Sequence, residues 1–151
     1  MYSTYETVAL NYESVESDWK HVLGLLFKRS DSFSLITTTP HPYSEYIECI
    51  HDRLLEPLRP FLISQKVGIR QWPGTETRDT HKVMNIYRAC AKSRELLISL
   101  GNVFQADTLH LPEDICFYRD NHAIFFTVSH ESMAFLASTI ALDKGAFEKY
   151  L

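Results

Sequence analysis

The chain has 151 residues, of which 45% are hydrophobic and 23% charged, and its formal net charge is −4 with the seven histidines counted as neutral. This is the composition of an ordinary folded domain, and it excludes a disordered or fibrous chain. The negative net charge argues against nucleic acid as the main ligand, because proteins bind phosphate backbones through clustered Lys and Arg. We therefore expect a single domain over residues 1–151 with one hydrophobic core.

The start of the chain and its cysteines indicate a cytoplasmic protein. The segment Met1–Glu6 lacks a basic start followed by an apolar run, and no stretch reaches the roughly 20 apolar residues that span a bilayer. Cys49, Cys90 and Cys116 cannot all pair, and none lies in a CxxC motif. We expect their thiols to be reduced, buried and catalytically silent, although any two of them could still form a disulfide.

Two elements are predicted in the first quarter of the chain. Ser14–Arg29 is expected to form an amphipathic helix with Ser14 as its N-cap. Its apolar side chains recur at spacings of three and four, and they are Val15, Trp19, Val22, Leu23, Leu26 and Phe27. Phe33–Thr39 alternates apolar residues with Ser and Thr, which predicts a short strand that ends before Pro40.

A second helix is predicted to begin near Tyr43 or Ser44. Its apolar positions are Ile47, Ile50, Leu54, Leu55 and Leu58. Pro57 and Pro60 each remove a backbone donor, so we expect the carboxyl end of this helix to be irregular.

A strand and a long third helix are predicted next. Val67–Trp72 alternates like a strand, and Pro73 with Gly74 marks a turn. From residue 79 or 80 to about residue 100, apolar side chains recur at helical spacing, and Gly101 is placed as a left-handed C-terminal cap.

The last part of the chain predicts a β-hairpin followed by two short helices. The hairpin strands are Ile115–Tyr118 and Ala123–Val128. Ser129 caps a helix to about residue 138, and Asp143 caps the last one. The predicted fold class is therefore α+β, with about four to five helices around a small, mainly antiparallel sheet.

Common catalytic and phosphate-binding motifs are missing from the sequence. It contains no GxxxxGK[ST], GxGxxG, GxSxG or HExxH pattern, and no repeated Cys and His ligand spacing. We therefore expect no cofactor and no bound metal.

The densest group of ionisable residues flanks the predicted hairpin. Glu113 and Asp114 precede it, and His130 and Glu131 follow it. Two carboxylates with a histidine could bind a divalent metal or act as general acid and base. The structural alternative is that Glu131 stabilises a helix dipole and that Glu113 and Asp114 cap a strand.

Two features favour an interaction with another protein. Glu45, Glu48, Asp52 and Glu56 share one face of the second predicted helix, where they either form a solvated surface or attract a basic partner. Trp72 before a proline either fills the core or stands at a rigid rim as an anchor for a partner.

Four short strings together resemble an uncharacterised family of small bacterial proteins. They are Trp72-Pro73-Gly74-Thr75, then Leu111-Pro112-Glu113-Asp114 with Cys116-Phe117-Tyr118, and finally Ser129-His130-Glu131. The resemblance covers roughly the carboxyl-terminal half of the chain and implies no particular chemistry.

The leading interpretation is a cytosolic protein-binding module, more specifically a bacterial immunity-type inhibitor of a basic toxin domain. Small size, mild acidity and the missing catalytic motifs favour it over an enzyme. The alternative is a small enzyme that uses Glu113, Asp114, His130 and Glu131. A second alternative is a structural or regulatory subunit that forms a homodimer.

Overall fold

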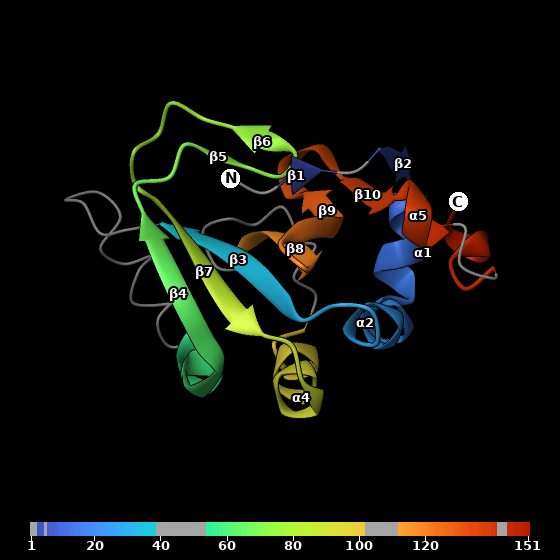
Figure 1. Ribbon diagram of the computed structural model, residues 1–151, viewed down its shortest axis with the longest axis horizontal. Coiled ribbons are helices and arrows are strands. Elements are labelled where there is room, and N and C mark those ends of the chain that lie inside the picture. The colour runs from blue at the N-terminus through green and yellow to red at the C-terminus, as the bar shows by residue number, and fades with distance from the viewer. Residues whose placement is uncertain (1–2, 5, 39–53, 102–111, 142–144) are drawn as a thin grey trace.

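The central element of the fold is an eight-stranded sheet in a computed structural model that describes residues 3–4, 6–38, 54–101, 112–141 and 145–151 (Figure 1). Its strands are β1 (Ser3–Thr4), β2 (Thr7–Ala9), β3 (Ser32–Thr38), β4 (Leu62–Val67), β7 (Lys82–Arg88), β8 (Glu113–Arg119), β9 (His122–Val128) and β10 (Met133–Ala137). Seven of them follow the order β2-β10-β9-β8-β3-β7-β4 and pair antiparallel. β1 pairs parallel with β9.

Short helices and a small hairpin complete the described structure. The α-helices are α1 (Tyr12–Ser17), α2 (Trp19–Phe27), α4 (Ala91–Ser99) and α5 (Ser138–Ala141), and the 3₁₀ helices are η1 (Glu56–Phe61), η2 (Ser129–Glu131) and η3 (Glu148–Tyr150). A separate hairpin joins β5 (Gln71–Trp72) to β6 (Thr75–Glu76). No helix within the described ranges is long and apolar enough to cross a membrane.

The main core lies between α1, α2 and α4 and one face of the sheet. Trp19, Val22, Leu23 and Leu26 of α2 are buried with Leu97 of α4. On the sheet side they meet an aromatic layer, in which the ring centroids of Phe33 and Tyr87 lie 5.4 Å apart and those of Phe33 and Phe117 5.7 Å apart. Strand side chains alternate between faces, so Ile36 and Met84 point to the opposite face, where Trp72 covers them.

The α+β class, the mainly antiparallel pairing and the hairpin of β8 and β9 are confirmed. β3 matches the predicted strand, and Gly101 has the left-handed φ of 82° expected of a C-terminal cap. The sheet is larger than predicted, because two segments expected to be helical are strands.

The first of these segments lies in the long helix predicted from residue 79 or 80 to residue 100. Residues 82–88 are instead β7, which pairs with β3 on one side and with β4 on the other. Only α4 is helical, and Cys90 rather than Asp79 or Thr80 is its N-cap. Hydrogen bonding to two neighbouring strands outweighs the helical spacing of Val83 and Tyr87.

The second segment is the predicted helix over residues 130–138. η2 ends at Glu131, its C-cap Ser132 adopts a left-handed φ of 54°, and the chain then forms β10 between β9 and β2. The reversal at Ser132 places Phe135 opposite Phe126, and their rings stack at 5.1 Å between centroids. Pairing with β9 therefore prevails over the local helix signal.

The predicted amino-terminal helix is divided in two at Asp18. This residue has φ −121° and ψ 29°, outside the helical region, and its carboxylate contacts the carboxyl-terminal residues Lys149 and Tyr150. The N-cap is Asn11 rather than Ser14, because the Asn11 side chain accepts a hydrogen bond from the Ser14 amide.

The remaining predictions are met in part. Val67 ends β4, and Gly68 with φ 71° turns the chain, so the predicted strand is divided between the last residue of β4 and Gln71–Trp72 of β5. The turn at Pro73 and Gly74 is confirmed by the β5–β6 hairpin. The second predicted helix lies largely outside the described residues, as does Asp143, and its end is the irregular 3₁₀ helix η1.

Candidate functional site

Asp114 is the most constrained of the predicted site residues. Its buried carboxylate accepts hydrogen bonds from Trp72 Nε1 at 2.8 Å, Thr75 Oγ1 at 3.3 Å and the Ser129 amide at 2.7 Å. Its own amide donates to Ser129 Oγ at 3.0 Å. These bonds join β8, the β5–β6 hairpin and η2, and they occupy both carboxylate oxygens, which indicates a structural role.

Tyr12 of α1 lies within electrostatic range of this carboxylate. Burial, then the charges of Glu16 and Asp114, raise the pKa of Tyr12 to about 12. The phenol is therefore neutral at physiological pH, and it is not available as a general base there.

The other three residues of the predicted enzyme site form contacts of their own. Glu113 is buried and forms an ion pair with Lys82 of β7, with 2.5 Å between Oε1 and Nζ. His130 and Glu131 are exposed on η2, where Nε2 and Oε1 lie 3.7 Å apart. Glu113 thus pairs with Lys82, whereas His130 and Glu131 pair with each other next to Ser129, whose amide donates to Asp114. Among the described residues there is no group of three or more His, Cys, Asp or Glu that could hold a metal ion.

Trp72 is a core residue and is not presented to a partner. Its side chain is 6% exposed, packs with Ile36, Met84 and Ile86, and donates its indole N–H to Asp114. The structure agrees with the core-filling alternative for this residue, because the β5–β6 hairpin folds the ring against the sheet.

The predicted acidic face can be located at only one of its four positions. Glu45, Glu48 and Asp52 lie outside the described residues. Glu56 is exposed at the start of η1, where Oε2 lies 3.0 Å from Arg59 Nη2. Its charge is partly balanced by this neighbour.

The two described cysteines are free thiols in different surroundings. Burial raises the pKa of the Cys116 thiol far above its usual value. Burial acts the same way on Cys90, but hydrogen bonds involving Ser93 and Lys92 and the charge of Arg88 outweigh it and lower the pKa of this thiol. Cys49 lies outside the described residues.

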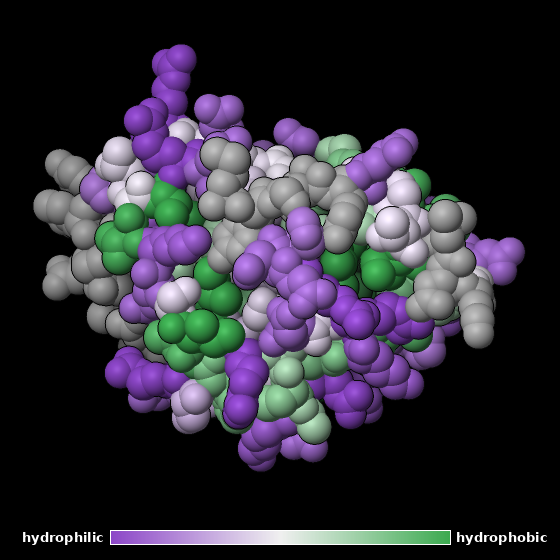
Figure 2. All heavy atoms as spheres, viewed as in Figure 1, coloured by the Kyte–Doolittle hydropathy of each residue, from purple (hydrophilic) through white to green (hydrophobic). Residues whose placement is uncertain are grey.

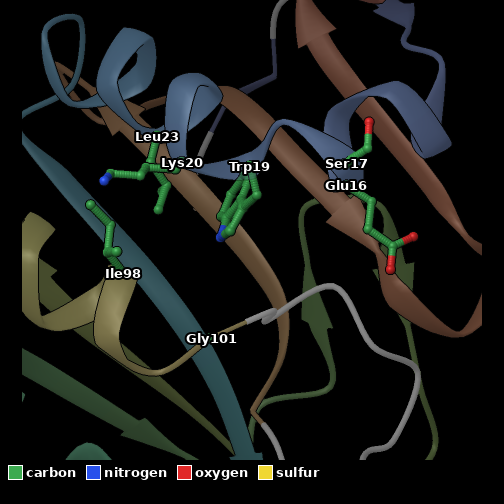
Figure 3. A pocket seen from close by; sticks show the side chains of 7 residues that line it. All are labelled: Glu16, Ser17, Trp19, Lys20, Leu23, Ile98 and Gly101. Carbon is green, nitrogen blue, oxygen red and sulfur yellow. The ribbon is translucent and has the colours of Figure 1, made fainter.

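Two adjoining pockets lie between α2 and α4, and Lys20 lines both. The first has a volume of about 250 Å³, and Figure 3 shows the Trp19 indole at its centre. Lys20, Leu23 and Ile98 lie on one side of the ring and Glu16 and Ser17 on the other (Figure 3). The second has a volume of about 430 Å³ and is lined by Asp18, Lys20, His21, Gly24, Leu25, Lys28 and Arg94. We call this second space the α2–α4 pocket.

Gly24 lies in the interior of α2, where a glycine costs about 1 kcal/mol relative to alanine. A Cβ at this position would meet no atom within 4 Å, and the residue has no left-handed φ. Neither packing nor backbone geometry requires a glycine here, and the residue lines the α2–α4 pocket.

The outer edge of β4 is the most exposed apolar feature among the described residues. β4 is the last strand in the sheet order and pairs only with β7 in the described structure. The side chains of Ile63 and Val67 are 60% and 72% exposed. Figure 2 shows hydrophobic surface on the left of the view, where β4 lies in Figure 1.

Neither β4 nor the α2–α4 pocket was found by sequence reasoning. Residues 62–66 carried no element prediction, because their alternation is weak and their strand character depends on β7. The pocket depends on two helices that are distant in sequence. The one local signal was Gly24 in the interior of an amphipathic helix.

No protein-family model, curated protein or solved structure matches the chain. The resemblance to small bacterial proteins therefore stays a prediction.

Proposed function

We propose that the protein is a protein-binding module that accepts an extended segment of a partner protein along the outer edge of β4. The observation that carries the proposal is the exposure of Ile63 and Val67 on the terminal strand of the sheet. An edge strand presents backbone N–H and C=O groups that another strand can pair with.

Burial of the two aliphatic side chains would strengthen such pairing. Fully burying a Val or Ile side chain contributes about 1.5–3 kcal/mol. Gln65 lies between them in the strand, and its side-chain amide already donates to Asn85 Oδ1 at 2.8 Å. The edge strand therefore presents two apolar side chains, Ile63 and Val67, on either side of the hydrogen-bonded Gln65. A partner strand with apolar side chains at the matching positions could pack against them.

The charge of the chain favours a basic partner. The formal net charge is −4, and Glu56 is exposed in η1 directly before β4. Long-range attraction increases the rate at which oppositely charged proteins meet. An immunity-type inhibitor of a basic toxin domain is the more specific form of this proposal.

The test compares two apolar-to-charged substitutions on different strands. Val67→Asp alters the β4 edge, and Met133→Asp alters the 38% exposed Met133 of β10 as a matched control. The partner captured from native cytosol by the tagged wild-type protein is purified and titrated against all three proteins. We expect Val67→Asp to weaken binding by about tenfold or more, and Met133→Asp to bind like the wild type.

Equal capture by all three proteins, including no capture at all, would contradict the proposal. Light scattering provides the second arm of the test. A wild-type dimer that Val67→Asp converts to a monomer would show that the edge binds a second copy of this chain instead of a different protein.

A further inference from the structure

We propose that the α2–α4 pocket binds the phosphate group of a small molecule. This inference is independent of the β4 edge, because the pocket is formed by α2 and α4 and shares no residue with β4. It rests on the positive charge of the pocket lining, on the unpartnered Nε donor of Arg94 and on the open space next to Gly24.

The lining of the pocket is positively charged in a chain that is negative overall. Lys20, Lys28 and Arg94 contribute three cations, and none of them is ion-paired with an acidic residue of the described ranges. The acidic lining residue Asp18 is balanced by Lys149, whose Nζ lies 2.8 Å from Oδ2. The pocket therefore favours an anion.

Arg94 has an unused hydrogen-bond donor. Its Nε atom is buried and has no hydrogen-bond partner, although guanidinium groups in proteins ordinarily use their donors. A small shift of this flexible side chain toward the pocket would let Nε–H and an Nη–H donate together to two oxygens of one phosphate. This fork arrangement is the strongest contact that Arg makes with phosphate.

The space matches a small phosphorylated molecule. A volume of about 430 Å³ falls within the ordinary range of small-molecule pockets. Gly24 lines this space, and the position that a Cβ would occupy is open, with no atom within 4 Å. Leu25 supplies an apolar contact for the part of the ligand that carries no charge.

Inorganic pyrophosphate is the first probe, titrated at low salt into the ¹⁵N-labelled protein and followed by amide chemical shifts. We expect saturable shifts in residues 20–28 and around Arg94 with a Kd near or below about 1 mM, weakened by added salt. Arg94→Gln should weaken binding about tenfold or more, and Gly24→Leu should abolish it by filling the pocket.

Lys92→Gln is the matched control, because Lys92 lies on the same helix, is exposed and pairs with Glu95. It should bind pyrophosphate like the wild type. An equal loss in Lys92→Gln and Arg94→Gln would mean diffuse surface attraction and overturn the proposal, as would the absence of shifts at about 10 mM probe. Unchanged binding by Gly24→Leu, with its fold verified by the amide spectrum, would also overturn it.

Adenosine monophosphate and glycerol 3-phosphate are then compared at equal charge. Tighter binding of the nucleotide would assign the site to nucleotides, and tighter binding of the glycerol ester would assign it to small phosphate esters without a base. Either result supports the proposed site. Failure of both to compete with pyrophosphate would contradict it.

Discussion

At the scale of single residues, Asp114 is a member of the ionisable cluster whose carboxylate is used in structural hydrogen bonds. It adopts a left-handed φ of 51°, which an Asp tolerates better than most residues. In this conformation the carboxylate reaches Trp72, Thr75 and Ser129, which belong to two other segments. The sequence correctly located a dense polar group here, but it could not show that the hydrogen bonds of Asp114 are satisfied internally.

Replacing Asp114 by alanine should destabilise the protein by about 3 kcal/mol, because the buried Trp72 Nε1 and Ser129 amide lose their acceptor. Asp120→Ala is the matched control, since Asp120 has the same φ of 51° but an exposed side chain. Urea unfolding should show a much smaller loss for Asp120→Ala. Equal losses would mean that backbone strain, rather than the hydrogen bonds, sets the cost.

The two described cysteines should differ in reactivity toward an alkylating reagent. Cys90 should react in the native protein. Its alkylation rate should rise at lower pH than that of an ordinary thiol, because its pKa is lowered and the thiolate is the reactive form. Cys116 should react only after unfolding, because burial raises its pKa and excludes the reagent. Peptide mapping after brief alkylation measures both. Modification of native Cys116 would contradict this description of the core.

At the scale of secondary structure, local pattern predicted the β8–β9 hairpin but not every strand whose pairing partner is close in sequence. The β8–β9 hairpin needs only a turn between two apolar runs, and it was predicted. β7 pairs with β3 and β4, and β10 pairs with β2 and with β9, which precedes it in the chain with only η2 between them. Both strands were predicted as helix. The spacing of Val83 and Tyr87 fits one face of a strand as well as one turn of a helix, so periodicity alone does not decide.

The docking of α2 on the sheet can be tested at Trp19. Its side chain is buried and lies 6.2 Å from Phe125 between ring centroids. Trp19→Ala should lower the free energy of unfolding by about 3–5 kcal/mol, because it leaves a cavity between helix and sheet. An unchanged denaturation midpoint would mean that α2 does not pack as described.

The contact between Asp18 and the carboxyl-terminal segment should depend on pH. Hydrogen bonds from Lys149 and Tyr150 hold the pKa of Asp18 below its usual value. The folded state therefore binds this proton less readily than the unfolded chain. The stabilisation is present above about pH 4 and is lost as the pH falls through the folded pKa.

Comparing the wild-type protein with Asp18→Asn measures this contribution. The wild type should unfold at higher urea concentration than the variant at neutral pH, and the difference should shrink as the pH falls below about 4. A difference that stays constant down to acidic pH would show that the carboxylate charge is not responsible.

At the scale of the whole molecule, the sequence predicted a function only from the missing catalytic motifs and the net charge. The two surfaces on which the proposals rest, the β4 edge and the α2–α4 pocket, are formed by tertiary packing. The edge of β4 exists because β7 is a strand, and the α2–α4 pocket exists because two helices distant in sequence pack side by side. Neither relation is written in a local pattern. The residues predicted for a partner contribute only Glu56 to the described surface near β4.

The central claim is that a partner protein pairs with the outer edge of β4. Hydrogen–deuterium exchange of the purified complex tests it most directly, because a new strand would protect the β4 backbone. We predict slower exchange of the amides of Leu62–Val67 in the complex than in the free protein, and unchanged exchange in the opposite edge strand, β2. Unchanged exchange in β4, with protection elsewhere on the molecule, would contradict the claim.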